Sequence, residues 1–367
     1  MAVSDAPSHG GNVHAAARDL RRPVGSILDF SASINPLGPS RQAVRAFHEA
    51  ASLVEHYPDP ECFSLKRTMA RRWKLSPERV VVGSGSTELI DVIPRALAIR
   101  SAMIVGPTYG EYARAVRHAG GRPSVVLARK ADNYRPPLEE VVRRLVDKRL
   151  GRQAIDAVFL CHPNSPTGRP CGHDDLRALF RAANRTRSWV ILDESFIEYC
   201  GELTCVPYLR SFSRLIILRS FTKFYGLPGL RIGYSLSSSS VAALLRRFLP
   251  PWSVSAVAQR AAEAAIMDER HARRSLRYIE KERARLALRL SSLEGVTVVP
   301  SSANFLLIEL PAPLRARAIT ADLRRQAMLV RDCSSVEGCT SRMIRIAVRA
   351  SRDNDRLIGA LARLLRR

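Results

Sequence analysis

One lysine of this sequence stands where it could do covalent chemistry. The chain has 58 Lys and Arg residues, of which only six are lysines, so arginine supplies nearly all of its basic surface. Lys223 comes shortly after the apolar run Leu215–Leu218, in the segment Ser220-Phe221-Thr222-Lys223. Unlike an arginine, a desolvated lysine can lose its proton and form a Schiff base with an aldehyde. A lone lysine is more often a surface residue, so this interpretation needs other groups that agree with it.

A glycine-rich turn offers an anion site. Gly83-Ser84-Gly85-Ser86-Thr87-Glu88 follows the apolar run Val80–Val82 and opens a helical pattern. Backbone N–H groups at such a turn point at an anion together with the helix dipole, and the hydroxyls add donors. The segment matches neither a P-loop nor a dinucleotide-binding motif. A phosphate fits it, and a structural turn without a ligand is the alternative.

Two further polar groups follow apolar runs. Asn164 lies between two prolines directly after Ala157–Cys161, at the end of a strand where α/β sheets place ligands. Asp193 ends the run Trp189–Leu192, where a buried carboxylate is costly unless a cation pairs with it. A protonated pyridine nitrogen would be such a cation. A structural turn for Asn164, and a helix cap or an arginine partner for Asp193, are the alternatives.

The elements that must position these groups alternate between strand and helix. This alternation predicts an α/β fold in which helices cover both faces of a mainly parallel sheet. Each of the four groups then lies at the carboxyl end of an expected strand. The expected strands are Val80–Val82, Ser101–Val105, Ser124–Leu127, Ala157–Cys161, Trp189–Leu192 and Leu215–Arg219, and the expected helices are Thr87–Ile99, Tyr112–Ala119, Leu138–Leu150 and Asp174–Asn184.

The last third of the chain has a different pattern. It begins with one long helical stretch, Ala256–Leu293, and we expect a smaller α+β domain there. The predicted domains are an N-terminal arm over 1–45, a large domain over 46–240 and a small domain over 241–367. Further strands are expected at Val296–Val299, Phe305–Glu309 and Met343–Val348, and helices at Ala316–Ala327 and Asp353–Leu365.

Composition narrows the class of protein. The net charge of +24 raises nucleic acid as a partner, but the arginines run through most of the chain and aromatic residues make up only 6%. Solvated helix faces are therefore favoured over a polyanion-binding surface. No stretch has the roughly 18 to 20 apolar residues of a membrane helix, and the first residues lack the pattern of a secretory signal. The seven cysteines are scattered without a C-x-x-C pair, so we expect a cytoplasmic protein that binds no metal.

Taken together and in chain order, the motifs resemble the fold-type I pyridoxal-phosphate (PLP) enzymes of the aspartate aminotransferase superfamily. The resemblance implies that Lys223 forms the Schiff base with PLP, that Asp193 keeps the pyridine nitrogen protonated, and that Asn164 donates to the ring O3′. It implies that Tyr109 stacks on the ring and that Tyr57 reaches the cofactor phosphate of a neighbouring subunit, and hence a homodimer. The residues implied for the phosphate are Gly85, Ser86, Thr87, Ser220, Thr222 and Arg231.

Other segments resemble the threonine-phosphate decarboxylase family of cobalamin biosynthesis, which acts on L-threonine O-3-phosphate. They are His9–Asn12, Asp29–Pro39, Tyr57–Asp59, Phe221–Arg231, Pro251–Val254 and Arg331–Ser334. The implied substrate is a small phosphorylated amino acid. The candidate substrate-binding residues are His9, Asn12, Asn35, Asn164, Arg331 and Arg345.

This second resemblance leaves three questions open. Ser33 and Ser165 stand where the family usually has Asn, and the change at Ser33 could shift substrate preference, for instance toward serine phosphate. Arg345 matches an arginine that binds an α-carboxylate, but the phosphate and the carboxylate cannot be divided between Arg331 and Arg345. The alternatives are a transaminase similar to histidinol-phosphate aminotransferase, although Phe196 replaces its usual Tyr, and a non-catalytic nucleic-acid-binding protein on this scaffold.

Overall fold

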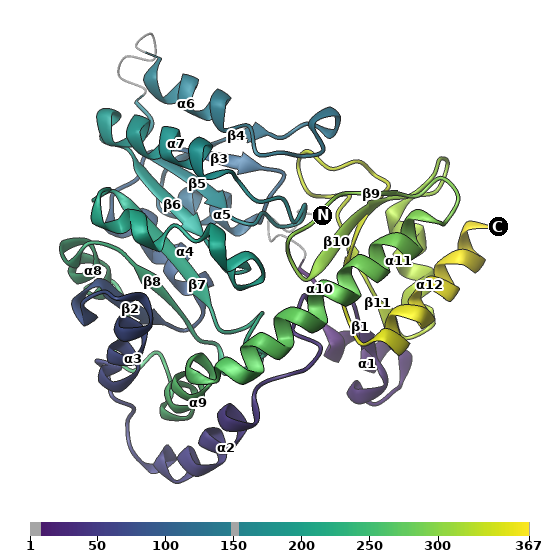
Figure 1. The fold of residues 1–367 in the computed structure, drawn as a ribbon, viewed down its shortest axis with the longest axis horizontal. Helices are drawn as coiled ribbons and strands as arrows, with labels where there is room; N and C mark the ends of the chain where they lie inside the picture. The colour runs from purple at the N-terminus through teal and green to yellow at the C-terminus, as the bar shows by residue number, and fades with distance from the viewer. Residues whose placement is uncertain (1–8, 148–153, 367) are drawn as a thin grey trace.

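The computed structural model describes residues 9–147 and 154–366, and its centre is a seven-stranded sheet (Figure 1). The strand order is β2-β8-β7-β6-β5-β3-β4. β8 is antiparallel to both of its neighbours, and the other six strands share one direction, which confirms the predicted α/β fold with a mainly parallel sheet. The strands are β2 (Val80–Gly83), β3 (Ser101–Gly106), β4 (Arg122–Leu127), β5 (Ala157–Cys161), β6 (Trp189–Asp193), β7 (Leu215–Ser220) and β8 (Gly233–Leu236).

Two hydrophobic clusters cover the two faces of this sheet. Successive residues of a strand point to opposite faces, so Leu192 belongs to one cluster and Ile191 to the other. The first face packs against α3 (Phe63–Trp73), α6 (Leu138–Val146) and α7 (His173–Thr186), and the second against α4 (Ser86–Ala96), α5 (Glu111–His118) and α8 (Ser239–Arg246). The helix expected over Leu138–Leu150 ends at Val146, and its last three residues lie outside the described part of the chain.

The C-terminal part forms a four-stranded antiparallel sheet of order β12-β13-β10-β9, together with the three helices α10, α11 and α12. Its strands are β9 (Thr297–Val298), β10 (Phe305–Glu309), β12 (Arg331–Asp332) and β13 (Met343–Ala347). Its helices are α10 (Glu269–Ser291), α11 (Ala316–Arg325) and α12 (Ser351–Leu365).

The expectation of one helix over Ala256–Leu293 is wrong. The chain forms α9 (Ala256–Met267) and then α10, because Asp268 has non-helical backbone angles, φ −81° and ψ 75°. Its carboxylate accepts a hydrogen bond from the backbone N–H of His271 at 2.9 Å and so caps α10. α8 and α9 pack against elements around the large sheet, α8 on β2 and α9 on α3.

The N-terminal segment contacts both parts of the molecule, and its strand belongs to a third sheet of two strands. After α1 (Val13–Leu20), β1 (Leu28–Asp29) pairs in parallel with β11 (Met328–Leu329). The chain then crosses to the large sheet and continues into α2 (Arg41–Glu49), which packs on α9. At the crossing, the backbone N–H of Asn35 donates to the carbonyl of Lys223 at 3.0 Å.

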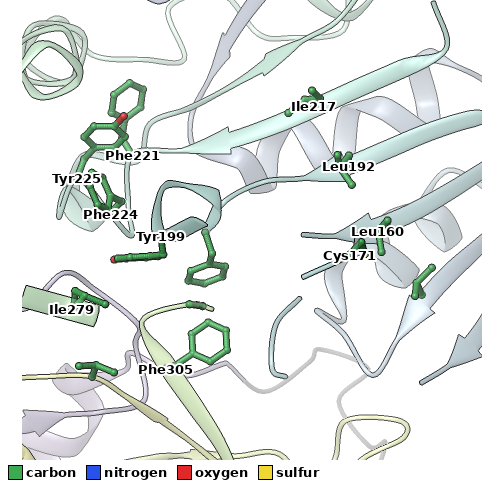
Figure 2. Close-up of a cluster of buried hydrophobic side chains, with 14 of the residues drawn as sticks. Leu160, Cys171, Leu192, Tyr199, Ile217, Phe221, Phe224, Tyr225, Ile279 and Phe305 are labelled. Carbon is green, nitrogen blue, oxygen red and sulfur yellow. The ribbon is translucent and has the colours of Figure 1, made fainter. Parts of the chain in front are cut away.

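Buried aromatic side chains lie between the two sheets, among them Tyr199, Phe224 and Phe305 (Figure 2). Phe224 lies against Tyr199 with ring centroids 5.3 Å apart. Phe196 lies against Phe305 of β10 at 5.0 Å. The loop after β7 is thereby packed between the large and small sheets. Within the described residues no helix is long and apolar enough to cross a membrane.

Candidate active site

Lys223 lies three residues beyond the end of β7, in surroundings that lower the pKa of its amine. Burial, followed by the positive charges of Arg345 and Arg231, lowers the pKa of Lys223 to about 8. The ring of Phe196 lies beneath the amine, with 6.0 Å between Nζ and the ring centroid. A lysine with this pKa is partly unprotonated near neutral pH and is therefore a competent nucleophile.

Asp193, at the end of β6, is buried and held by two residues that we did not predict. The Tyr112 hydroxyl donates to Oδ2 at 2.7 Å, and the Ser195 backbone N–H and hydroxyl donate to Oδ1 at 2.9 and 2.5 Å. Burial raises the pKa of Asp193, and the hydrogen bonds from Ser195 and Tyr112 oppose that rise. The carboxylate is thus oriented by neutral donors, and a cation placed against it would offset the cost of burying its charge.

Asn164 is held by the loop that contains it. Its amide donates to the carbonyl of Pro107 at 2.8 Å and to the Thr167 hydroxyl at 2.9 Å, and its oxygen accepts from the Thr108 hydroxyl at 3.0 Å. Both amide hydrogens therefore have partners within the chain. A contact from Asn164 to a ligand hydroxyl requires that one of these partners be exchanged, and the predicted contact to O3′ stays a prediction.

Tyr109 lies between the rings of His9 and Tyr112, at centroid distances of 5.3 and 5.6 Å. Burial raises the pKa of Tyr109, and a hydrogen bond with Thr87 at the start of α4 opposes that rise. Thr87 thus lies beside the ring that we expect to stack on a ligand.

The residues predicted to form an anion cradle lie where β2 and β7 end and β8 begins. Gly233 is paired with both Gly83 and Ser220 across the three strands. Gly85 has a φ of +84°, and a Cβ there would lie 2.7 Å from Nη2 of Arg231. The hydroxyls of Ser220 and Thr222 are 2.7 Å apart. The first amides of α4, a guanidinium and two hydroxyls therefore converge, which is a donor set that suits a phosphate.

Two arginines face each other across adjacent strands of the small sheet. Arg331 of β12 is paired with Arg345 of β13. Arg345 donates to the Ser165 hydroxyl and the Ser31 carbonyl, both at 2.8 Å, and lies 5.0 Å from the ring centroid of Phe305. Burial lowers the pKa of Arg345, and the charge of Arg331 lowers it further. Two like charges directly opposite each other are unfavourable, so an anion placed between them would be stabilising.

Of the other candidate substrate-binding residues, one lies beside the site and two make hydrogen bonds within the fold. His9 lies at the site, with Nε2 2.7 Å from Oε1 of the buried Glu111. The side chain of Asn12 caps α1 through the N–H of Ala15, and that of Asn35 donates to the carbonyl of Phe224 at 2.9 Å. Asn12 and Asn35 thus have structural partners, and their contacts with substrate stay predictions.

Tyr57 lies on the surface of the protomer. It is 81% exposed and packs against Trp252, with 4.8 Å between the ring centroids. It is therefore available to another subunit.

Sequence reasoning missed Tyr112 and Ser195, although weak signals were present. Tyr112 lies in the first turn of α5, three residues after Tyr109, which precedes the helix. Ser195 comes two residues after Asp193, the spacing at which an Asp side chain accepts from a following backbone N–H. Neither spacing indicates a function until the strand and the helix are seen packed together.

Comparisons with known proteins bear on the family of this chain. The family model for aminotransferase class I and II matches residues 26–364. The chain is 36% identical to a threonine-phosphate decarboxylase of Salmonella typhimurium, over 98% of this chain and 96% of that one. It is 31% identical to an adenosylcobalamin biosynthesis bifunctional protein of Leptospira interrogans, over 98% of this chain and 41% of that one.

A solved structure of similar fold contains a cofactor. The histidinol-phosphate aminotransferase of Sinorhizobium meliloti, in complex with pyridoxal-5′-phosphate, is 26% identical with a TM-score of 0.86. The match covers 99% of this chain and 96% of that one.

Proposed function

The chain belongs to the class I and II aminotransferase family, and we propose that it decarboxylates L-threonine O-3-phosphate to (R)-1-amino-2-propanol O-2-phosphate in cobalamin biosynthesis. The observation that carries the substrate class is the pair Arg331 and Arg345, which face each other on β12 and β13. A substrate with an anion at each end, a carboxylate and a phosphate, suits two cations near one reactive lysine. The similarity of this chain to the decarboxylase from Salmonella typhimurium supports the proposed reaction.

The enzyme uses PLP, and the residues of the site fit it. Lys223 would hold the aldehyde, Asp193 the pyridine nitrogen and Tyr109 the ring face. When bound, PLP supplies an electron sink next to the α-carbon of an amino acid. The phosphate would lie at the cradle made by Gly85, Ser86, Thr87, Ser220, Thr222 and Arg231.

The residues of this chain supply binding, orientation and proton control. Arg331 and Arg345 bind the two anionic ends and so fix which bond of the α-carbon stands across the ring plane. Decarboxylation needs the bond to the carboxylate in that position. Lys223, with its lowered pKa, holds a proton that it can return to the α-carbon after CO2 has left. The aromatic rings of Phe196 and Phe305 keep water away from these groups.

The test compares two products of the same incubation. Purified protein with PLP, L-threonine O-3-phosphate and 2-oxoglutarate is assayed for CO2, and for glutamate formed when the substrate transfers its amino group to 2-oxoglutarate. We expect CO2. Glutamate formation without CO2 would contradict decarboxylation and favour the alternative, an aminotransferase similar to those that act on histidinol phosphate. Salt-sensitive DNA binding without either product would favour the non-catalytic alternative.

We also propose that the protein is a homodimer with shared active sites, in the cytoplasm. The exposed pair Tyr57 and Trp252 supports the dimer, since large aromatic residues left at a surface are typical of subunit contacts. The seven cysteines are free thiols, which agrees with a reducing compartment.

A further inference from the structure

A charged cluster lies on the reverse face of the sheet, directly behind the active-site groups. Because side chains alternate along a strand, Asp193 and Ser220 point to one face, while Glu194 and Arg219 point to the other. Arg219 is only 1% exposed and Glu194 is 0% exposed. Both are immediate neighbours in sequence of residues that we place at the cofactor.

The cluster ties three segments together. Nη2 of Arg219 lies 2.7 Å from Oε2 of Glu194, and Nη1 lies 3.1 Å from Oε1 of Glu198. Nη2 also donates to the Thr204 hydroxyl at 2.7 Å. Glu194 accepts in addition from the backbone N–H of Cys205 at 2.6 Å. The end of β6, the segment Ile197–Leu203 with the turn after it, and the end of β7 are therefore joined through one guanidinium.

The guanidinium is also held from the side of α3. Its Cζ lies 4.3 Å from the ring centroid of Trp73, whose indole N–H donates to the Tyr234 hydroxyl at 3.0 Å. Burial acts to lower the pKa of Arg219, but the carboxylates of Glu194 and Glu198 outweigh it and raise that pKa. The arginine therefore stays charged, and its guanidinium is held in one position by these contacts.

Stability alone does not account for such a cluster. Replacing a buried ion cluster with neutral residues of similar volume is often neutral or stabilising, because the charges must first lose their water. Ile217 lies on the same face of β7, two residues earlier, and packs into an apolar core. An apolar residue at position 219 would extend that core. The arginine instead gives the strand ends a hydrogen-bonded geometry that apolar contacts do not define.

We propose that Arg219 is a positioning residue, which through Glu194 and Glu198 holds the ends of β6 and β7 so that Asp193 and Lys223 act on one cofactor. The inference rests on the PLP-binding part of the proposed function and not on the choice of reaction. Arg219 acts from behind and need not touch the cofactor or the substrate.

The test neutralises the whole cluster, so that no charge is left buried alone. The triple variant Arg219→Met/Glu194→Gln/Glu198→Gln is compared with the parent for melting temperature, PLP affinity of the cofactor-free protein, and kcat and KM. We expect a melting temperature close to that of the parent, with PLP affinity and kcat each lower by at least about tenfold, because small displacements of reacting groups are costly. KM should change little, since Arg331 and Arg345 lie on the small sheet.

A further readout isolates the lysine. In the cofactor-free protein, the rate at which an amine reagent labels Lys223 is measured against pH and located by mass spectrometry. The midpoint should move in the triple variant, because the amine no longer has its fixed distance from Asp193 and Arg231. The matched control is Arg285→Met, which breaks a partly buried pair with Glu282 in the small domain and should lower the melting temperature without changing PLP affinity or the labelling midpoint.

Each outcome decides the question. A folded triple variant with parental PLP affinity, kcat and labelling midpoint would overturn the inference, as would a loss of stability with these three unchanged. If the triple variant does not fold, Glu198→Gln decides, because it removes one charge and keeps an acceptor for Arg219. It should weaken PLP binding in the same direction, and unchanged binding would overturn the inference. A protein that binds PLP but releases no CO2 would refute only the proposed reaction.

Discussion

At the residue scale, the proton balance of Lys223 sets a pH dependence. The folded-state pKa of Lys223, about 8, lies below the usual value of 10.5. Between pH 8 and pH 10.5 this lysine is therefore protonated in a larger fraction of unfolded chains than of folded ones. The contribution of this lysine to the stability of the cofactor-free protein therefore rises with pH across that window and is lost as pH falls towards 8. We expect the rate at which cofactor-free protein takes up PLP to rise through pH 8 and then level off. Stopped-flow absorbance checks this, and a rate independent of pH from 7 to 9 would contradict it.

The Tyr112 hydroxyl should affect the pKa of Asp193 and hence kcat, without contributing to the stability of the fold. Tyr112→Phe removes the hydroxyl that donates to Oδ2 of Asp193 and keeps the ring against Phe159. Hydrogen bonds to charged groups contribute about 1.5 to 3 kcal/mol, so we expect kcat to fall by roughly tenfold or more. The pKa of Asp193 should rise, since a donor to its charged form is lost. The measurement is kcat against pH for both proteins.

The control for Tyr112 is Tyr134→Phe. Tyr134 is also buried, and its hydroxyl contacts the sulfur of Met343 in a separate cluster. Loss of kcat in both variants alike would show that the effect of Tyr112 is general destabilisation.

The principal candidate residues could be proposed from the sequence because each carries its own chemistry. Lys223 is one of six lysines, and Asp193 ends an apolar run. Tyr112 and Ser195 act by contacting Asp193, and a contact of this kind depends on how α5 packs on the sheet. Asn35 contains a polar group that suits a substrate, but the fold uses it to hold the loop of Lys223.

At the scale of elements, Gly233 shows how closely β8 must approach α4. A Cβ at position 233 would lie 2.5 Å from the backbone nitrogen of Ser86 and 2.9 Å from the carbonyl oxygen of Arg219. These are backbone atoms, so Gly233→Ala should push the start of α4 away from the cradle. We expect PLP affinity to fall by at least about tenfold, and the free energy of unfolding to fall by about 1 to 3 kcal/mol.

Fluorescence titration and urea unfolding measure the two effects of Gly233→Ala. Gly229→Ala is the matched control, because a Cβ there meets nothing within 4 Å. Parental PLP affinity in Gly233→Ala would show that the cradle does not bind the phosphate.

Strands that form clear apolar runs between helical segments were predictable from the sequence, whereas a short strand and a helix break at one residue were not. The six expected strands of the large sheet are present with ends that differ by at most two residues. β8 was not predicted, because Gly233–Leu236 is short and contains a glycine and a serine. The break at Asp268 interrupts a run rich in alanine and arginine, where periodicity continues through the cap. Pairing with β2 and β7 defines β8, and the backbone angles of Asp268 define the break.

At the scale of the whole molecule, the packing of helices on the large sheet bears on where one domain ends and the next begins. The predicted boundary at residue 240 separates two sequence patterns, but α8 spans it, α9 lies beyond it, and both pack against elements around the large sheet. Composition describes a segment, whereas packing depends on which surface that segment covers. For this reason the domain boundaries stay a prediction, and the dimer does too.

The proposed dimer makes a prediction that no single chain can satisfy. If Tyr57 contacts the cofactor of the other subunit, each active site takes Lys223 from one subunit and Tyr57 from its neighbour. A homodimer of Tyr57→Ala and a homodimer of Lys223→Ala should then both be inactive. In a mixed dimer, one site carries both changes, and the other combines an intact Lys223 with an intact Tyr57 from its neighbour. Random exchange of subunits should therefore restore about one quarter of the parental activity, because half of the dimers are mixed and each has one working site. Activity is measured after mixing the inactive variants under conditions that allow exchange, with light scattering to establish the mass. A mixture as inactive as its components, from chains shown to exchange, would place Tyr57 at the site of its own protomer or outside any site.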